Sequence, residues 1–104
     1  MSSKSLFELA TQDPIELNSL VLKSKLAALI RILVKEKNLS QTKTAEILLT
    51  TQPRVSNLLN GQVNKFSIDF LLVSLLRLGY KADFDYDPTD LDEPLIISMK
   101  EAVL

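Results

Sequence analysis

The chain of 104 residues contains no cysteine and no histidine, and these two absences exclude several kinds of site. Without cysteine there is no disulfide framework, no thiolate zinc site and no cysteine nucleophile. Without histidine, the usual general base and the commonest metal ligand are also missing. No cluster of carboxylates at ligand spacing replaces them. We therefore expect a protein that is not an enzyme and that has no catalytic residues, no metal site and no cofactor.

Glycine, proline and long apolar runs are also scarce. Two glycines and four prolines, with abundant leucine and an apolar fraction of 46%, favour a folded and mainly helical protein. No apolar run reaches the roughly 18 residues of a membrane span. The residues Met1-Ser2-Ser3-Lys4 lack the apolar segment of a signal peptide. We therefore expect a cytoplasmic protein that does not associate with a membrane.

The net charge of −1 conceals a segregation of charge along the chain. Residues 20–67 hold eight basic and two acidic residues, a net charge of +6, whereas the flanks hold four basic and eleven acidic residues, a net charge of −7. A basic segment beside acidic flanks is typical of a protein with one face for phosphate and another for a different partner. Chance clustering of surface charges is the alternative.

Two short helices joined by a tight turn are predicted in the basic segment. Ser40 caps a first helix over residues 41–48, and Thr51 caps a second helix that starts at Gln52-Pro53. Asn60-Gly61 ends the second helix, because glycine readily adopts the left-handed conformation needed there. The shared inner face is small or apolar apart from one threonine. Its members are Thr44, Ala45, Leu48, Val55 and Leu58.

The second of these helices presents an unusual set of polar side chains. Gln52, Arg54, Ser56 and Asn57 are left pointing outward. This is the layout of a DNA-binding helix-turn-helix, whose second helix enters the major groove and offers its N-terminal residues to base edges. A generic helical hairpin has no reason to gather these four side chains on one short exposed helix.

The unit resembles the helix-turn-helix of the XRE (Cro/repressor-like) family, and residues 13–86, roughly 70% of the chain, resemble the branch that includes HigA-like antitoxins. This resemblance implies a repressor of its own operon that also neutralises a small basic ribonuclease toxin. The family usually places glycine at the turn position of Leu49, where a bulky left-handed residue costs on the order of 1 kcal/mol. The motifs that carry the resemblance are Leu39-Ser40-Gln41, Ala45-Glu46, Gln52-Pro53-Arg54-Val55-Ser56-Asn57-Leu58-Leu59-Asn60-Gly61, Phe66-Ser67-Ile68 and Leu76-Arg77-Leu78-Gly79-Tyr80.

Residue chemistry divides the predicted DNA contacts into two groups. Gln52 and Asn57 suit adenine through paired hydrogen bonds, Arg54 suits a guanine or a phosphate, and Ser56 suits the backbone or a thymine methyl. Helix N-termini and lysines suit phosphate, although capping and solvation are the alternative roles for some of these residues. The predicted phosphate contacts are Gln41, Thr42, Lys43, Thr51, Asn60 and Lys65.

Three further helices are predicted around this unit. Residues 1–12 form a short leading helix that packs on the core or on a partner. Asp13 caps a long helix that starts at Pro14 and reaches about Lys37. Ser67 caps a helix over residues 68–78 that ends at Gly79, and Phe66 before it is read as structural. Spacings of three and four residues assign two buried stripes. Their members are Leu22, Leu26, Leu29, Ile30 and Leu33 in the long helix, and Ile68, Leu71, Leu72, Leu75 and Leu76 in the last one.

Residues 80–86 alternate apolar and polar side chains, as a half-buried strand does. A single strand needs a partner, and the body offers no convincing second one. The simplest prediction is pairing with a second subunit across a two-fold axis, through Tyr80, Ala82, Phe84 and Tyr86. An extended segment lying on the core is the alternative. The acidic and then apolar tail, residues 87–104, binds a basic partner or folds back on the chain's own basic surface, and its residues 95–99 suit a helix or a strand.

The sequence therefore predicts a mainly all-α fold with about five helices, a helix-turn-helix and one C-terminal strand. Residues 1–86 form the domain, and residues 87–104 form the tail. The predicted function is a dimeric, sequence-specific repressor of double-stranded operator DNA, with a small basic ribonuclease toxin as a further partner. Two alternatives stay open. One is a stand-alone regulator, phage-like or chromosomal, without a toxin, and the other is a protein-interaction module on a helix-turn-helix scaffold.

Overall fold

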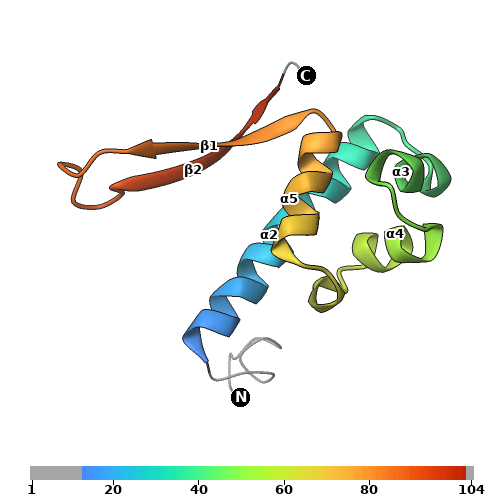
Figure 1. Ribbon diagram of the computed structural model, residues 1–104, viewed down its shortest axis with the longest axis horizontal. Helices are drawn as coiled ribbons and strands as arrows, with labels where there is room; N and C mark the ends of the chain where they lie inside the picture. Colours follow the sequence, from blue (N-terminus) through green and yellow to red (C-terminus); the bar gives the residue numbers. More distant parts are fainter. Residues whose placement is uncertain (1–12, 103–104) are drawn as a thin grey trace.

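A computed structural model of the chain describes residues 13–102, and within them four α-helices pack together beside a two-stranded sheet (Figure 1). The mainly helical fold class is confirmed. The predicted leading helix over residues 1–12 lies outside the described residues. The elements are α2 (Pro14–Glu36), α3 (Gln41–Leu48), α4 (Gln52–Leu59), the 3₁₀-helix η1 (Val63–Lys65), α5 (Ile68–Arg77), β1 (Tyr80–Tyr86) and β2 (Leu95–Glu101).

All four predicted N-caps are confirmed, so local sequence determines where the helices begin. In each case a side-chain oxygen accepts a hydrogen bond from a backbone N–H in the first helical turn, a group that has no partner within the helix. The Asp13 carboxylate accepts from Ile15 at 2.9 Å, and the hydroxyls of Ser40, Thr51 and Ser67 accept from Lys43 at 3.0 Å, Arg54 at 3.4 Å and Phe70 at 3.0 Å.

The turn between α3 and α4 is closed by Leu49 in the left-handed conformation, with φ 54° and ψ 49°. Two bonds fix it, because the Leu49 N–H donates to the Glu46 carbonyl at 3.3 Å and the Thr50 N–H donates to the Ala45 carbonyl at 3.0 Å. The conformation that a bulky residue disfavours is therefore the one adopted. The Leu49 side chain is 71% exposed, so it gains little from packing in return.

Leu49→Gly should stabilise the fold by up to about 1 kcal/mol. Relief of left-handed strain is worth about 1–2 kcal/mol, and the greater freedom of glycine in the unfolded chain offsets about half of it. Urea denaturation followed by circular dichroism measures the difference. Leu49→Ala is the matched control, since it removes the same side chain but keeps the Cβ. Equal stabilities of the two variants would contradict the strain argument.

The core lies where α2 and α5 pack together, and α4 and η1 pack against α2 at the same place. The predicted inner face of α3 and α4 is confirmed, since Thr44, Ala45, Leu48, Val55 and Leu58 are all buried. The buried threonine hydroxyl is satisfied, because it donates to the Ser40 carbonyl at 2.8 Å. A polar side chain is therefore tolerated inside this face without the cost of an unpaired buried group.

Four leucines assigned to the core by their spacing are exposed, so that part of the prediction is wrong. Their exposed fractions lie between 36% and 44%. The reason is that α2 and α5 are apolar over a wider arc than their neighbours cover. Leu26, Ile30 and Leu33 face the core, whereas Leu22 and Leu29 lie on a part of α2 that the core does not cover. The four exposed residues are Leu22 and Leu29 in α2 and Leu72 and Leu76 in α5.

The strand over residues 80–86 has its partner within the same chain, so the inference that it needs a second subunit is wrong. The tail supplies β2, which pairs antiparallel to β1 from Tyr80 opposite Glu101 to Tyr86 opposite Leu95. Backbone bonds close both ends of this hairpin. Asp87 donates to Pro94 at 2.8 Å near the turn, and Ala102 donates to Gly79 at 2.9 Å at the base. The turn between the two strands contains the acidic residues Asp87, Asp90, Asp92 and Glu93.

One exposed ion pair crosses the polar face of the hairpin, where Lys100 Nζ lies 2.9 Å from Asp83 Oδ2. Its hydrogen bond to Lys100 is the main reason that the pKa of Asp83 is lowered, and the same bond raises the pKa of Lys100. A lowered carboxyl pKa stabilises the fold above the unfolded value of about 3.9. The contribution of this pair is therefore present at neutral pH and is lost as the pH falls below about 4.

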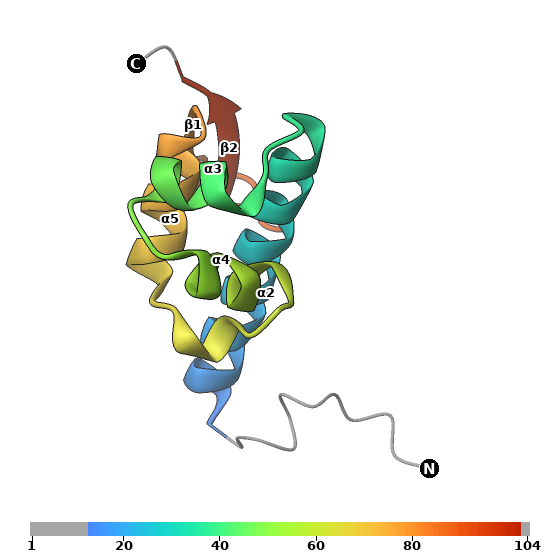
Figure 2. The same ribbon diagram turned by 90° about the vertical axis from the view of Figure 1, so that its right-hand side faces the viewer.

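The hairpin and the α3–α4 unit lie on opposite sides of the α2–α5 pair (Figure 1). The hairpin leaves the end of α5 and projects away from the helices, with its turn at the far end. Seen from the right-hand side of Figure 1, α3 and α4 lie in front of α2 and α5 (Figure 2). The two parts of the molecule therefore present separate surfaces.

Candidate nucleic-acid interface

The candidate interface is built on α4, which is held from its inner side. Val55 and Leu58 are essentially inaccessible, and α4 packs against both α2 and α3. Leu59 is partly buried against the same core, and the polar side chains of this eight-residue helix are exposed or half-buried. Figure 2 shows α4 on the side of the molecule that α3 also occupies. Because the inner face is fixed by packing, the outer face is presented as a rigid polar surface.

The structure brings the four predicted base-contacting residues together on α4. Gln52 and Arg54 are exposed, and Ser56 and Asn57 are half-buried. Gln52 is the first residue of the helix and Arg54 the third, so both lie in the first turn. No acidic side chain occurs on α4. This surface therefore offers amide and hydroxyl groups, with one guanidinium, to a neighbouring molecule.

Arg54 is positioned by two aromatic rings that lie outside the helix-turn-helix. Its guanidinium carbon is 4.6 Å from the centre of the Phe66 ring and 5.6 Å from that of Phe70, and the two ring centres are 5.3 Å apart. Such a cation–π contact is worth about 0.5–1 kcal/mol at an exposed site. The aromatic faces restrict the guanidinium without occupying its N–H donors, so Arg54 is preorganised for an anion or a base edge.

This contact was not predicted from the sequence. The prediction that Phe66 is a structural residue agrees with the burial of its ring. No role was predicted for Phe70. Nothing in the spacing of Arg54 and the two aromatic residues indicates stacking, because η1 and the start of α5 must fold back beside α4 before the groups meet.

The predicted phosphate contacts lie mainly at the N-terminus of α3. Gln41, Thr42 and Lys43 are exposed there. Lys43 Nζ lies 3.4 Å from Glu46 Oε2, and both side chains are largely exposed. An exposed pair of this kind contributes about 0–1 kcal/mol, so Lys43 remains available to a stronger anionic partner. The backbone N–H groups and the positive end of the helix dipole at the same terminus also favour an anion.

The other predicted phosphate contacts divide into two kinds. Thr51 uses its hydroxyl to cap α4, and the Asn60 amide donates to the Ser56 hydroxyl at 3.5 Å, so both side chains make contacts within the helix. Lys65 is exposed on η1. Asn60 is the C-cap residue of α4, which supports its capping alternative, while its side chain bonds to Ser56 and not to the backbone. The role of each residue toward DNA stays a prediction.

A family model described as a helix-turn-helix domain matches residues 8–85. The chain belongs to this helix-turn-helix family. The match indicates a DNA-binding regulator and covers the whole of α2, α3, α4 and α5. No curated protein and no solved structure matches the chain significantly.

No helix within residues 13–102 is long and apolar enough to cross a membrane. In the same residues, no three or more acidic side chains gather in a way that could hold a metal ion.

Proposed function

We propose that the protein is a sequence-specific repressor that binds double-stranded operator DNA through α4. The observation that carries this proposal is the division of α4 between a fully buried inner face and an outer face of Gln52, Arg54, Ser56 and Asn57. A helix of this size fits the major groove, where amides can make paired hydrogen bonds to adenine. Gln52 and Asn57 read bases in this proposal.

Contacts to phosphate set the register of α4 on the duplex. Lys43 and the N–H groups at the start of α3 are suited to one strand, and Lys65 on η1 is suited to the backbone on the other side of α4. Arg54, held against Phe66 and Phe70, contacts a phosphate at the groove edge or a guanine. These contacts depend on charge, so affinity should fall as salt displaces them.

We also propose that the protein acts as a homodimer in the cytoplasm, where it occludes a promoter. Two copies of α4 related by a two-fold axis can enter successive major grooves about one helical turn apart. Doubling the number of base contacts raises the specificity that one eight-residue helix supplies. A palindromic operator follows from this symmetry.

A fluorescence-anisotropy titration against DNA from upstream of the protein's own gene tests the repressor. Scrambled DNA of the same length is the control, and both titrations are made at 50 and 200 mM salt. Tight binding to the upstream fragment alone, weakened roughly 10³-fold or more by the higher salt if six or more phosphates are contacted, is the expected result. Equal and weak binding to both fragments would overturn the proposal.

A second proposed activity is the neutralisation of a small basic ribonuclease toxin encoded beside the protein. It is supported by the resemblance to HigA-like antitoxins and by the exposed acidic hairpin turn, which carries Asp87, Asp90, Asp92 and Glu93 around Leu91, a side chain that is 91% exposed. Co-expression with the neighbouring gene product, followed by purification and a ribonuclease assay, tests it. The expected result is a stable complex without ribonuclease activity. If the neighbouring gene product neither binds this protein nor cleaves RNA, the toxin proposal fails and a stand-alone regulator remains.

The alternative function from a different class is a protein-interaction module, in which the helix-turn-helix is only a scaffold. It predicts that binding to any DNA is weak and shows no preference for the upstream fragment. The neutral and basic surface of α4 argues against it, because protein-binding surfaces of this size are usually built around large apolar side chains. The same titration separates the two functions.

A further inference from the structure

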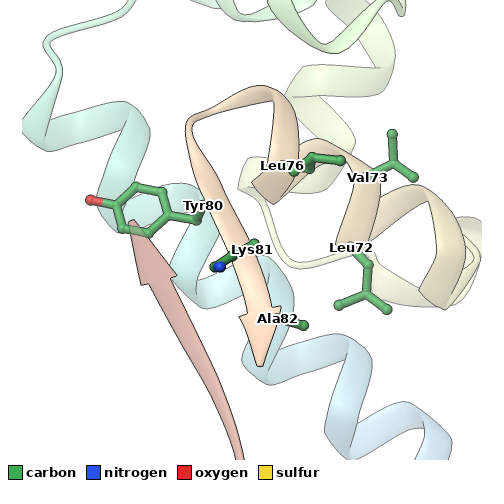
Figure 3. A pocket seen from close by; sticks show the side chains of 6 residues that line it. All are labelled: Leu72, Val73, Leu76, Tyr80, Lys81 and Ala82. Atoms are coloured by element: carbon green, nitrogen blue, oxygen red, sulfur yellow. The ribbon is translucent and has the colours of Figure 1, made fainter. Parts of the chain in front are cut away.

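The exposed leucines of α2 and α5 lie beside the apolar face of the hairpin. Leu22 and Leu29 of α2 and Leu72 of α5 form walls of a groove of about 250 Å³, which the hairpin closes with Phe84 and Ile97. The apolar surface continues across α5. Figure 3 shows Leu72, Val73 and Leu76 beside Ala82 of β1, where they line a second apolar depression.

The hairpin itself is poorly covered toward its turn. Phe84 lies opposite Ile97 and Tyr86 lies opposite Leu95, so these four side chains share one face of the sheet. Phe84 is 62% exposed, Tyr86 71% and Ile97 59%. An isolated two-stranded hairpin is at best marginally stable in water, so a covering partner is expected for this half.

The size of this surface is unusual for a monomer. Monomeric proteins rarely expose contiguous apolar patches larger than a few hundred Å². A phenylalanine or tyrosine buries about 150–250 Å² when it is enclosed, so Phe84 and Tyr86 alone leave roughly 200 Å² uncovered. Leu95 and Ile97 on the same face of the hairpin, and Leu22, Leu29 and Leu72 on the helices beside it, are between 36% and 59% exposed and enlarge this patch further.

We propose that a second copy of this chain covers this surface, with the uncovered part of each apolar hairpin face, toward the turn, packed against the exposed leucines of α2 and α5 of the other copy. The inference rests on the proposed function only for its expectation of a two-fold dimer. The surface is self-complementary, as a two-fold interface requires, because it contains both a groove and an apolar projecting arm. The four leucines that the sequence assigns to a core then become buried between subunits, or border the buried surface.

Charge supports a second copy as the occupant. The groove wall carries the basic side chain of Lys25, and Lys23 lies two residues before it on α2. The arm ends in an acidic turn over residues 87–93. When the arm of one copy lies along α2 of the other, opposite charges meet at the rim of the interface, where they guide association and register.

This arrangement leaves the DNA-binding surface free. The hairpin lies on the side of α2 and α5 opposite to α3 and α4 (Figure 1), and its Phe84 and Ile97 line the groove. A dimer formed through this surface therefore presents both copies of α4 without covering either. Dimer formation and operator binding become separately testable.

The full chain is examined by light scattering after gel filtration and by sedimentation equilibrium. The expected mass is twice 11.7 kDa. Ile97→Lys should raise the dimer dissociation constant by about 100-fold or more, because it places two charges in an apolar interface. Ile96→Lys is the matched control. Ile96 lies on the opposite face of the same strand, opposite Asp85, so the new ammonium would face a carboxylate.

Circular dichroism shows whether Ile97→Lys still folds, and Leu22→Lys on the other wall of the groove gives an independent test with the hairpin intact. Both variants should be folded and monomeric. A monomeric wild-type protein at about 100 µM, well above the Kd of a stable dimer, would overturn the inference and leave residues 1–12 of the chain or another protein as the occupant. Equal dissociation constants for Ile96→Lys and Ile97→Lys would also overturn it.

The inference and the proposed function can fail separately. A wild-type monomer that binds the upstream DNA specifically would remove the dimer surface and keep the repressor. A dimer that dissociates on Ile97→Lys but prefers no DNA sequence would keep the surface and remove the repressor.

Discussion

Asn57→Ala and Gln52→Ala should each reduce the preference for operator over scrambled DNA by about 1–3 kcal/mol, or roughly 5- to 150-fold. Each variant removes an amide that can donate to and accept from the same adenine. Neither residue contributes to the apolar core, so the thermal unfolding midpoint should stay close to that of the wild type. Anisotropy titrations with both DNA fragments at one salt concentration measure the change.

Lys43→Ala is the matched control for these variants. It removes an exposed charge at the start of α3, so it should weaken binding to operator and scrambled DNA alike. The slope of log affinity against log salt should fall by about 1. If Gln52→Ala and Asn57→Ala behave like Lys43→Ala, or leave the operator affinity unchanged, then α4 is not the reading helix.

Leu71→Ala should lower the free energy of unfolding by about 2–5 kcal/mol. Leu71 of α5 is fully buried in the cluster that joins α2, α4, η1 and α5, so its truncation leaves a cavity at the centre of the domain. Since small domains have a total stability of about 5–15 kcal/mol, the variant loses a large fraction of it, and its urea midpoint should fall clearly below that of the wild type. Urea denaturation followed by circular dichroism gives the value.

Leu91→Ala is the control for this experiment. Leu91 lies in the hairpin turn and is almost fully exposed, so the same truncation should change the free energy of unfolding by less than about 0.5 kcal/mol. A loss at Leu71 no larger than that at Leu91 would show that the α2–α5 contact does not dominate stability.

The α3–α4 unit could be predicted closely because its determinants are local. Ser40 and Thr51 each hold an N–H three residues ahead, and Leu49 closes the turn through bonds to the preceding helix. The inner face from Thr44 to Leu58 follows from helical spacing within about fifteen residues. N-cap residues and the helical spacing of apolar residues can be recognised in a sequence. The position of the candidate site on α4 could therefore be predicted from them.

The contact between Arg54 and the rings of Phe66 and Phe70 shows where such prediction ends. The residue types identify a cation and two aromatic groups, but their distances depend on how the chain after α4 returns through η1. The pairing of β1 with β2 likewise depends on two segments that come together only in the folded chain. Alternation predicted the first strand, whereas residues 95–99 were compatible with a helix or a strand until a partner was present.

The sequence by itself determined the helix boundaries, the turn and the polar outer face of α4, since caps, glycines and helical periodicity act over a few residues. Only the tertiary structure decided which apolar stripe is covered. Leu26 and Leu29, three residues apart on α2, are equally apolar, yet the first is 5% exposed and the second 39%. Periodicity shows that a face is apolar, but the placement of neighbouring elements decides whether that face joins the core or remains as a surface for a partner.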